Sequence, residues 1–279
     1  MRRILFLLLT LVLILHYFNK EEDIQTYEVI CKRSNGEIEN IDLETYVMGV
    51  VAAEMPISFE EEALKAQSVA ARTFVLSRDL KVDDTTNSQV YLDKSQRKER
   101  WKDNFDAYEK KLKKVIDATK GEVLTYDDAY ISALFFSSSS GKTENNEDYF
   151  DSSAIPYLRS VSSDYEKPIV EYNHISTAKL IETFGGSYMV ILSYTKGGSV
   201  NEVRIGDTIY SGREVREKLG LNSSCFDIVE SDDGYSLTTY GFGHQVGMSQ
   251  YGANGMAKEG FSYKEILRHY YQEVCIKTL

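Results

Sequence analysis

The sequence predicts an α+β protein that combines a helical catalytic centre with short mixed β-sheets, behind an N-terminal membrane anchor. Residues 42–80 have helical periodicity and capping residues, whereas several segments after Gly121 have the two-residue period of strands. Residues 4–15 form an apolar run in which Thr10 is the one polar residue. A chain of 279 residues is long enough for one large or two small domains, and we expect two loosely defined lobes.

The composition excludes several classes of protein. Three Pro and 18 Gly in 279 residues rule out a collagen-like or low-complexity chain. The 32 Lys and Arg stand against 43 Asp and Glu, which leaves a net charge of −11. Binding to a phosphate backbone requires surplus cations, so we expect no nucleic-acid partner.

Residues 1–20 are predicted to be an uncleaved signal anchor. Two arginines precede the apolar run and acidic residues follow it. The first Ser is Ser34 and the first Ala is Ala52, so no small-residue cleavage site follows the run. The arginines keep the N-terminus inside, which makes residues 21–279 an extracytoplasmic domain at the cell membrane. The alternative is a buried core helix.

The first expected elements are a hairpin and two helices. Asn35 and Gly36 favour a turn between strands at 27–33 and 37–43. Asp42 is placed to cap a helix that Pro56 ends. A second helix is predicted over 61–80, because its first turn is acidic and its end is basic.

The middle of the chain is predicted to change from helix to strand. Residues 81–91 are expected to be a polar loop, and 96–119 a single charged helix. That helix presents either a solvated face with paired charges or a patch for an anionic ligand. Strands are expected at 121–126 and 129–136.

The part of the chain after residue 165 is predicted to alternate short strands and helices. Residues 165–195 are less regular, and a small second lobe is expected at about 165–205. The remaining expected elements are helices at 176–185, 212–221 and 262–272, strands at 200–206, 208–211, 226–230 and 235–241, and a Gly-rich loop within 241–260 that leads into a helix.

The cysteines and histidines do not form metal-binding or disulfide motifs. Cys31, Cys225 and Cys275 contain no CxxC pair. A bond between Cys225 and Cys275 is one alternative, but buried free thiols are expected. None of the four His has the ligand spacing of a catalytic zinc site.

Glu54 is the candidate general acid. It follows four small apolar residues at the end of the predicted first helix. Poor hydration and the negative end of the helix dipole both disfavour its charged form. The alternative is an exposed carboxylate in the last turn of the helix.

Gln67 and Arg72 lie on adjacent faces of the second predicted helix. A separation of five residues corresponds to about 140° around the helix, so the two side chains do not share one narrow stripe. They are candidate cleft residues. The alternative is an ordinary polar face on which Arg72 pairs with Glu60 or Glu61.

The serine run at 137–140 has three interpretations: a polar loop, a hydrolase nucleophile, or hydroxyl groups that bind sugar. Ser139 and Lys142 match SxxK, but the other motifs of that class are missing. Ser249 fails the GxSxG pattern because Tyr251 occupies the last position. A serine hydrolase is therefore disfavoured.

His244 lies in a Gly-rich loop that would hold it rigidly at a surface. Glycines at 241, 243, 247 and 252 permit close backbone approach, and Ser249 is placed to cap the following helix. His244 is either a structural residue or a catalytic one.

Taken together, these segments resemble the stage II sporulation protein D family, whose members are membrane-anchored lytic transglycosylases of bacterial cell-wall glycan. The resemblance covers most of the chain after the predicted anchor. The segments that carry it occur in the family's order: VVAAEMP (50–56), LKAQSVAARTF (64–74), FSSSSGKTEN (136–145), GREVREKLGLNSS (212–224) and GHQVGMSQYGANGMA (243–257).

The resemblance implies a site and a reaction. It places the catalytic acid on Glu54 and substrate-binding residues on Gln67, Arg72, Ser137, Ser139, His244, Gln250 and Tyr251. It implies cleavage of peptidoglycan strands with formation of 1,6-anhydro-N-acetylmuramic acid ends, without a cofactor, during engulfment in sporulation. The implied partners are the stage II sporulation protein P amidase and the membrane protein M.

The sequence differs from the family in two ways that bear on which site residues the resemblance implies. Relatives often read His-Ser-Thr-Ser-Gly-Gly in the serine loop, whereas this chain has Phe136 and Ser140 in place of the His and the first Gly. Some relatives hold zinc with His and Cys near this loop, and residues 130–150 contain neither. We therefore expect no zinc. The alternative function is a glycan-binding scaffold that recruits or activates a separate amidase.

Overall fold

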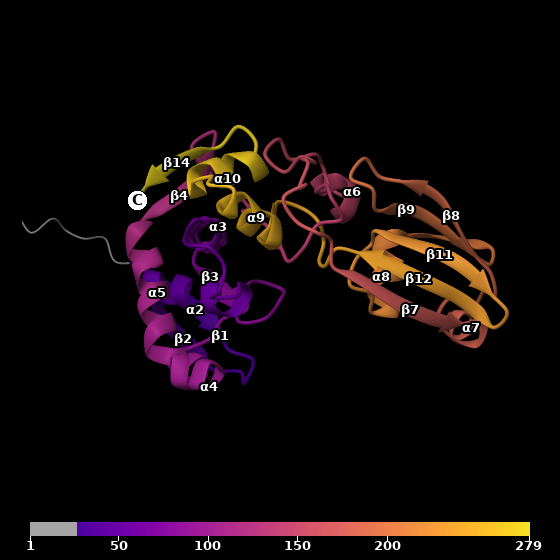
Figure 1. Ribbon diagram of the computed structural model, residues 1–279, viewed down its shortest axis with the longest axis horizontal. Helices are drawn as coiled ribbons and strands as arrows, with labels where there is room; N and C mark the ends of the chain where they lie inside the picture. Colours follow the sequence, from indigo (N-terminus) through magenta and orange to yellow (C-terminus); the bar gives the residue numbers. More distant parts are fainter. Residues whose placement is uncertain (1–26) are drawn as a thin grey trace, which may run out of the picture.

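The computed structural model describes residues 27–279, a mixed α/β structure with five short sheets in this part of the chain (Figure 1). The prediction of helices combined with short sheets is confirmed. The predicted anchor at 1–20 lies outside the described residues. Within 27–279, no helix combines the length and the apolar character that crossing a bilayer requires.

The N-terminal hairpin and the first helix form as predicted. Strand β1 (Glu28–Lys32) pairs antiparallel with β2 (Ile38–Asp42). The Oδ1 atom of Asp42 accepts a hydrogen bond from the backbone N–H of Thr45 at 3.0 Å and caps helix α2 (Leu43–Glu54). The helix ends two residues before Pro56, which cannot continue it.

Helix α3 (Glu61–Ser77) is the centre of the larger hydrophobic cluster. Its sequence is rich in Ala, so neighbouring elements approach its axis closely. The elements in contact with it include α2, α5 (Phe105–Ala118), α9 (Gln250–Lys258), α10 (Tyr263–Tyr270) and β4 (Glu122–Tyr126). Helices α2 and α3, near the start of the described chain, therefore share one core with α9 and α10 near its end (Figure 1).

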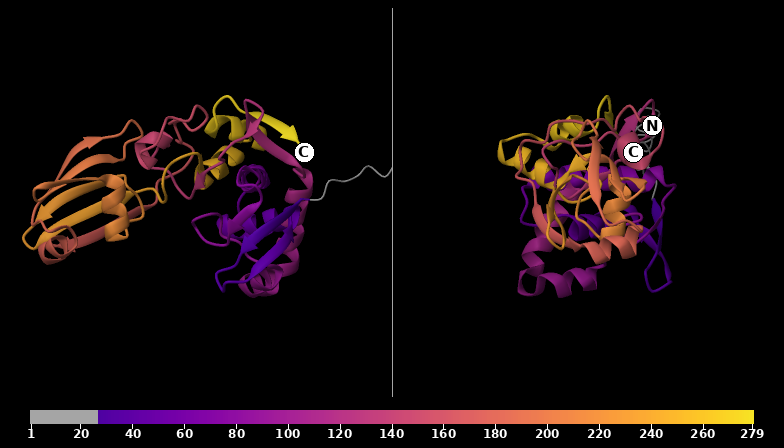
Figure 2. Two further views of the ribbon diagram at one scale, coloured as in Figure 1. Left: turned by 180° about the vertical axis from the view of Figure 1, so that it is seen from behind. Right: turned by 90° about the vertical axis from the view of Figure 1, so that its right-hand side faces the viewer.

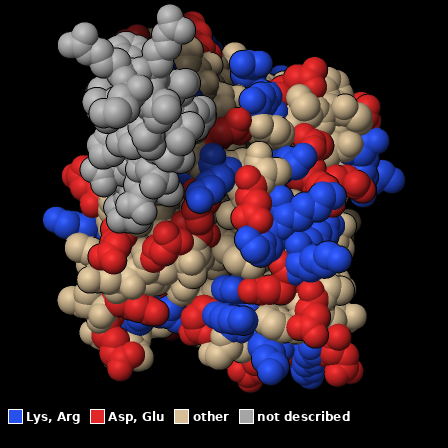
Figure 3. Space-filling model, turned by 90° about the vertical axis from the view of Figure 1, so that its left-hand side faces the viewer, with Lys and Arg blue, Asp and Glu red and all other residues tan. Residues whose placement is uncertain are grey.

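The charged segment predicted as one helix is interrupted, so that prediction is wrong. It comprises α4 (Lys94–Trp101), a 3₁₀ turn (Lys102–Asn104) and α5. The break occurs where Lys102 adopts a positive φ of 47°, which no α-helix accommodates. Figure 3 shows Lys and Arg interspersed with Asp and Glu on this side of the molecule. On α5, the Nζ atom of Lys113 lies 2.8 Å from a carboxylate oxygen of Asp117 and that of Lys114 lies 2.7 Å from one of Glu61, as the interpretation of a solvated face with paired charges predicts.

The segment predicted as a strand at 129–136 is two short strands in different sheets. Strand β5 (Ala129–Tyr130) pairs with β4, which also pairs with β14 (Cys275–Thr278). Strand β6 (Phe135–Phe136) instead pairs in parallel with β13 (Met248–Ser249). The chain therefore leaves one sheet for another, which places the serine loop against the Gly-rich loop.

A second hydrophobic cluster contains two three-stranded sheets and two helices. One sheet has the order β10 (Thr208–Ser211), β9 (Val200–Ile205), β8 (Met189–Tyr194); the other has the order β11 (Phe226–Ser231), β12 (Gly234–Tyr240), β7 (Val170–Ser176). Helices α7 (Thr177–Phe184) and α8 (Gly212–Leu219) complete it. Figure 2 shows it at the opposite end of the molecule from α2 and α4.

Three strands lie where the sequence predicts no regular strand. Strands β7 and β8 fall within the segment described above as less regular, and β3 (Lys81–Asp83) falls within the predicted polar loop. Strand β8 pairs with β9, the next strand along the chain, whereas β7 and β3 are held by distant segments, β12 and β1. Local patterning does not encode such long-range pairs.

All three cysteines are free. Cys31 is buried, as expected, and burial raises the pKa of its thiol to about 11. Cys225 is half-buried and Cys275 is exposed, so the expectation of buried thiols is wrong for Cys275. The strand that carries Cys275 is the outer strand of its sheet, which leaves the side chain open to solvent.

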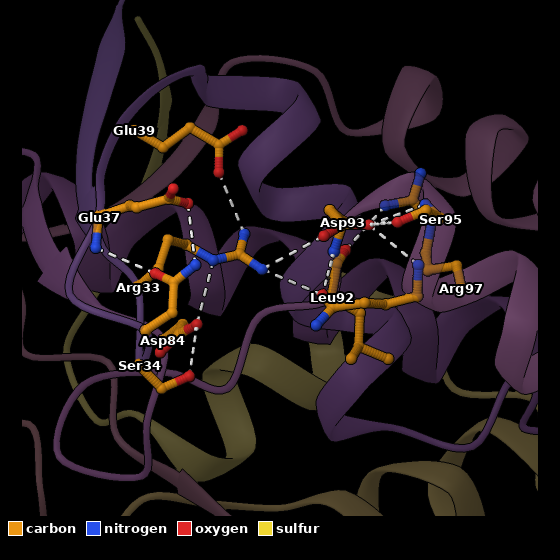
Figure 4. Close-up of polar contacts among 11 residues, drawn as sticks. Arg33, Ser34, Glu37, Glu39, Asp84, Leu92, Asp93, Ser95 and Arg97 are labelled. Atoms are coloured by element: carbon orange, nitrogen blue, oxygen red, sulfur yellow. Dashed lines mark hydrogen bonds and ion pairs between the residues drawn. The ribbon is translucent and has the colours of Figure 1, made fainter.

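Arg33, in the turn after β1, fixes the segment that leads from β3 to α4 (Figure 4). Its guanidinium lies 3.1 Å from a carboxylate oxygen of Asp84, 3.3 Å from one of Asp93 and 3.2 Å from one of Glu39. Asp93 in turn caps α4. These contacts hold residues 84–93 against the hairpin, and this segment reaches the candidate site described next.

Candidate active site

A pocket of about 860 Å³ lies among elements of both hydrophobic clusters. Its walls come from the ends of α2 and α3, the loop at 86–88, residues 132–137, helix α6 (Asn146–Phe150), helix α8 and residues 242–244. Four of the residues predicted for the site line it: Glu54, Ser137, His244 and Gln250.

Glu54 is the last residue of α2 and is half-buried in the pocket wall. Its Oε1 atom accepts a hydrogen bond from the backbone N–H of Val90 at 2.7 Å, which fixes the carboxyl group. Burial raises the pKa of Glu54, and the hydrogen bond from Val90 opposes part of this effect. A fixed carboxyl group with a raised pKa is suited to act as a general acid.

The pocket offers one carboxyl group that is free of ion pairs within the described residues. The other acidic side chain on its wall is Glu217 of α8. An oxygen of Glu217 lies 2.7 Å from the Nε atom of Arg213 in a salt bridge. Because Arg213 neutralises Glu217, Glu54 is the carboxyl group that is available for proton transfer.

His244 is held as a neutral ring. Its Nδ1 atom accepts a hydrogen bond from the backbone N–H of Val246 at 3.1 Å, so the ring proton is on Nε2. The rings of Phe136, Tyr149 and Phe150 surround it, with centroids 5.7–5.9 Å away. Burial, together with the charge of Arg216, lowers the pKa of His244 to about 4. His244 can therefore donate a hydrogen bond at neutral pH but carries no charge.

Three of the other predicted residues lie behind or beside the pocket wall. Gln67 is completely buried, and its Oε1 atom lies 3.5 Å from the Nε2 atom of Gln250, which lines the pocket. Ser139 is also buried, and its hydroxyl accepts a hydrogen bond from the N–H of Gly141. Tyr251 is exposed and packs edge-on against Phe59. The structure therefore does not bring these three side chains onto the pocket wall.

Arg72 has a different position from the one that the sequence predicts. Its side chain is fully buried, with Nε and Nη2 at 2.9 and 2.6 Å from the two carboxylate oxygens of Glu44. Its Nη1 atom donates to the carbonyl of Glu122. The alternative, a pairing with Glu60 or Glu61, does not form either, because Glu61 lies 11 residues earlier on the same helix, a rise of about 16 Å. Arg72 does not line the pocket.

Several pocket residues were not found from the sequence. Helix α3 contributes Phe74 and, just beyond its end, Arg78. The others come from the loop at 86–88, from α6 and from α8: Thr86, Asn87, Ser88, Asn146, Tyr149, Phe150, Arg213, Arg216 and Glu217. The motif at 212–224 predicted helix α8, but nothing in the sequence indicated that this helix lines the same pocket as Glu54.

The residues around the serine loop do not fit a zinc ion. Across residues 27–279, no group of three or more His, Cys, Asp or Glu side chains is arranged to hold a metal. Glu144, the buried acid next to this loop, accepts hydrogen bonds from the Thr195 hydroxyl at 2.7 Å and the Ser199 N–H at 2.9 Å. We therefore assign no step to a metal.

Comparison with known proteins shows which family the chain is similar to. The model of the family described as "SpoIID: Stage II sporulation protein" matches residues 32–126. Stage II sporulation protein D of Bacillus subtilis is 45% identical over 266 residues, which cover 87% of this chain and 76% of that protein. The chain belongs to the stage II sporulation protein D family.

Two more distant relatives show how far the similarity extends. An uncharacterized protein of Brachyspira hyodysenteriae is 33% identical over 260 residues, covering 86% of this chain and 67% of that protein. A Bacillus subtilis protein named "Amidase enhancer" is 30% identical over 287 residues. That match covers 80% of this chain but only 39% of the larger protein.

Proposed function

We propose that this protein is a lytic transglycosylase that cleaves peptidoglycan strands during sporulation, with Glu54 as its acid and base. The observation that carries the proposal is the single carboxyl group without an ion pair on the pocket wall within residues 27–279. Glycoside hydrolases ordinarily use two carboxyl groups, one as the acid and one to activate water or attack the sugar. A transglycosylase needs only one, because the substrate supplies the nucleophile.

In the proposed reaction, Glu54 first donates its proton to the glycosidic oxygen as the bond between that oxygen and the anomeric carbon of N-acetylmuramic acid breaks. The 6-hydroxyl of the same sugar then attacks the anomeric carbon, and the Glu54 carboxylate accepts the hydroxyl proton. The products are a 1,6-anhydro end and a free 4-hydroxyl. No water is consumed, and Glu54 returns to its protonated form.

The surrounding groups support this role for Glu54. Val90 holds the carboxyl group in one orientation through its backbone N–H. The neutral ring of His244, the Gln250 amide and the Ser137 hydroxyl belong to the same wall. Polar groups of these kinds bind sugar hydroxyl and acetamido groups, and the aromatic rings beside them suit the apolar faces of sugars.

The decisive experiment compares the parent protein with Glu54→Gln on purified peptidoglycan strands. Gln keeps an oxygen that can accept the N–H of Val90 but has no proton to donate at neutral pH. We expect 1,6-anhydro products, identified by mass spectrometry, from the parent and a loss of at least about 10²-fold in rate for Glu54→Gln. Equal rates from a folded Glu54→Gln protein would refute the proposal.

A second candidate function is that of a scaffold that binds glycan and stimulates an amidase. It is favoured by the similarity to the protein named "Amidase enhancer". Under this alternative, both the parent and Glu54→Gln accelerate a separate cell-wall amidase, and neither forms 1,6-anhydro ends. The stage II sporulation protein P amidase and the membrane protein M are the partners we propose to test by co-purification.

We also propose that residues 1–20 anchor the protein in the cell membrane with residues 21–279 outside the cytoplasm. The support is the apolar run between two arginines and the following acidic residues. Protease added to intact protoplasts should degrade the protein and leave a cytoplasmic marker intact. Recovery in the soluble fraction with a new N-terminus near residue 25 would contradict this proposal.

A further inference from the structure

The charge of the pocket is opposite in sign to that of the chain. The whole sequence has a net charge of −11, yet three arginines and two glutamates line the pocket. Glu217 is neutralised by Arg213, and burial favours the uncharged form of Glu54. The wall of the pocket is therefore positive in an otherwise acidic protein, which favours an anionic ligand there.

The three arginines differ in what they bind within the described residues. Arg213 pairs with Glu217 and stacks on Tyr149, with its guanidinium 5.2 Å from the ring centroid. Arg216 donates to the Tyr149 hydroxyl at 2.5 Å and to a backbone carbonyl at 3.2 Å. Arg78 has no hydrogen-bond or carboxylate partner among residues 27–279.

Arg78 is nevertheless oriented. It follows the end of α3, and its guanidinium lies 5.1 Å from the centroid of the Phe74 ring, which is nearly buried. Stacking on an aromatic ring restricts the planar guanidinium while its N–H groups remain free at the edge. Both side chains line the same pocket as Glu54. The Arg78 guanidinium therefore presents N–H donors to the pocket in a restricted orientation, with no acceptor for them among residues 27–279.

We propose that Arg78 is a specificity-determining residue that binds a carboxylate on an acidic sugar of the glycan. A carboxylate matches the guanidinium fork with two parallel hydrogen bonds. This inference rests on the proposed function, because in peptidoglycan the acidic sugar is N-acetylmuramic acid, whose lactyl group carries the carboxylate. Arg78 would then distinguish this sugar from the neutral N-acetylglucosamine.

The test measures binding by isothermal titration calorimetry in a Glu54→Gln background, which prevents turnover. One probe is a tetrasaccharide of alternating N-acetylglucosamine and N-acetylmuramic acid with free carboxylates. The matched probe is the same tetrasaccharide with each carboxylate reduced to an alcohol. We expect the acidic probe to bind about tenfold more tightly, with a difference that shrinks at high ionic strength.

Adding Arg78→Gln should abolish this preference and leave the affinity for the reduced probe unchanged. Arg78→Lys, which keeps the charge but not the fork, should retain only part of it. The control is Arg268→Gln, an exposed arginine of α10 outside the pocket, which should keep the full preference. Because Arg78 is exposed, circular dichroism should show all variants folded.

Three outcomes would overturn the inference: equal binding of the two probes, retention of the preference by Arg78→Gln, or no binding of either probe. Product analysis of the otherwise unmodified protein separates this failure from failure of the proposed function. Formation of 1,6-anhydro ends at equal kcat/KM from both probes would refute the role of Arg78 alone. A tenfold binding preference without such products would refute the transglycosylase alone.

Discussion

Mutation of Arg72 tests directly whether this predicted site residue binds substrate or stabilises the folded protein. Its guanidinium is fully buried and makes two contacts with Glu44, at 2.6 and 2.9 Å, and one with the carbonyl of Glu122 at 3.0 Å. Removing one partner of a buried ion pair typically costs about 3–5 kcal/mol. Because the Glu44 side chain is 21% exposed, we expect Arg72→Met to lower the free energy of unfolding by about 3 kcal/mol, the lower end of this range.

Urea unfolding at pH 7 measures this effect, with Arg268→Met as the exposed control. Glu44→Ala should also destabilise the protein, since it leaves the Arg72 guanidinium buried without a carboxylate. The double variant should be less destabilised than the sum of the single variants by about 2 kcal/mol. If Arg72→Met instead lost less than about 1 kcal/mol while weakening glycan binding, the structural role assigned to Arg72 would be refuted.

Three further predictions concern the pocket and the helix that follows it. Burial raises the pKa of Glu54 in the folded protein, so the parent loses stability as the pH rises through this raised pKa. Glu54→Gln should therefore be more resistant to urea than the parent at pH 8. This gain should vanish below about pH 4, where the glutamate is protonated in both the folded and the unfolded chain. An unchanged difference at all pH values would contradict this. The pKa of His244 is lowered from 6.5 to about 4, so the unfolded chain takes up a proton before the folded one, and stability should fall by up to about 3 kcal/mol between pH 7 and pH 4. His244→Asn should remove most of that dependence in pH-dependent urea unfolding, whereas His174→Asn, at an exposed site, should preserve it. Ser249 caps α9 by accepting from the N–H of Gly252, and its buried hydroxyl donates to Oε1 of Glu166, so Ser249→Ala should cost at least about 1 kcal/mol in thermal unfolding. Ser249→Asp should not recover it, because the new carboxylate would lie against that of Glu166.

Local sequence patterns determined the parts of this protein whose causes are local. Asp42 and Pro56 set the two ends of α2, the Asn-Gly turn set the first hairpin, and Ser249 set the start of α9. In each case the residues responsible lie within a few positions of the element that they shape. The same locality explains why Glu54 was identified, since its small apolar neighbours and its place at a helix end are both visible in the sequence.

Contacts between distant segments were decided only in the tertiary structure. Strands β3 and β7 depend on partners that lie far along the chain, and the segment at 129–136 divides because its ends pair with different sheets. Arg72 pairs with Glu44 rather than with an acid on its own helix, and Arg78 lines the pocket with no carboxylate partner among residues 27–279. Burial and charge pairing depend on how the chain packs. The sequence was therefore sufficient to identify Glu54 as the candidate acid, whereas the arginines that line its pocket were identified only from the tertiary structure.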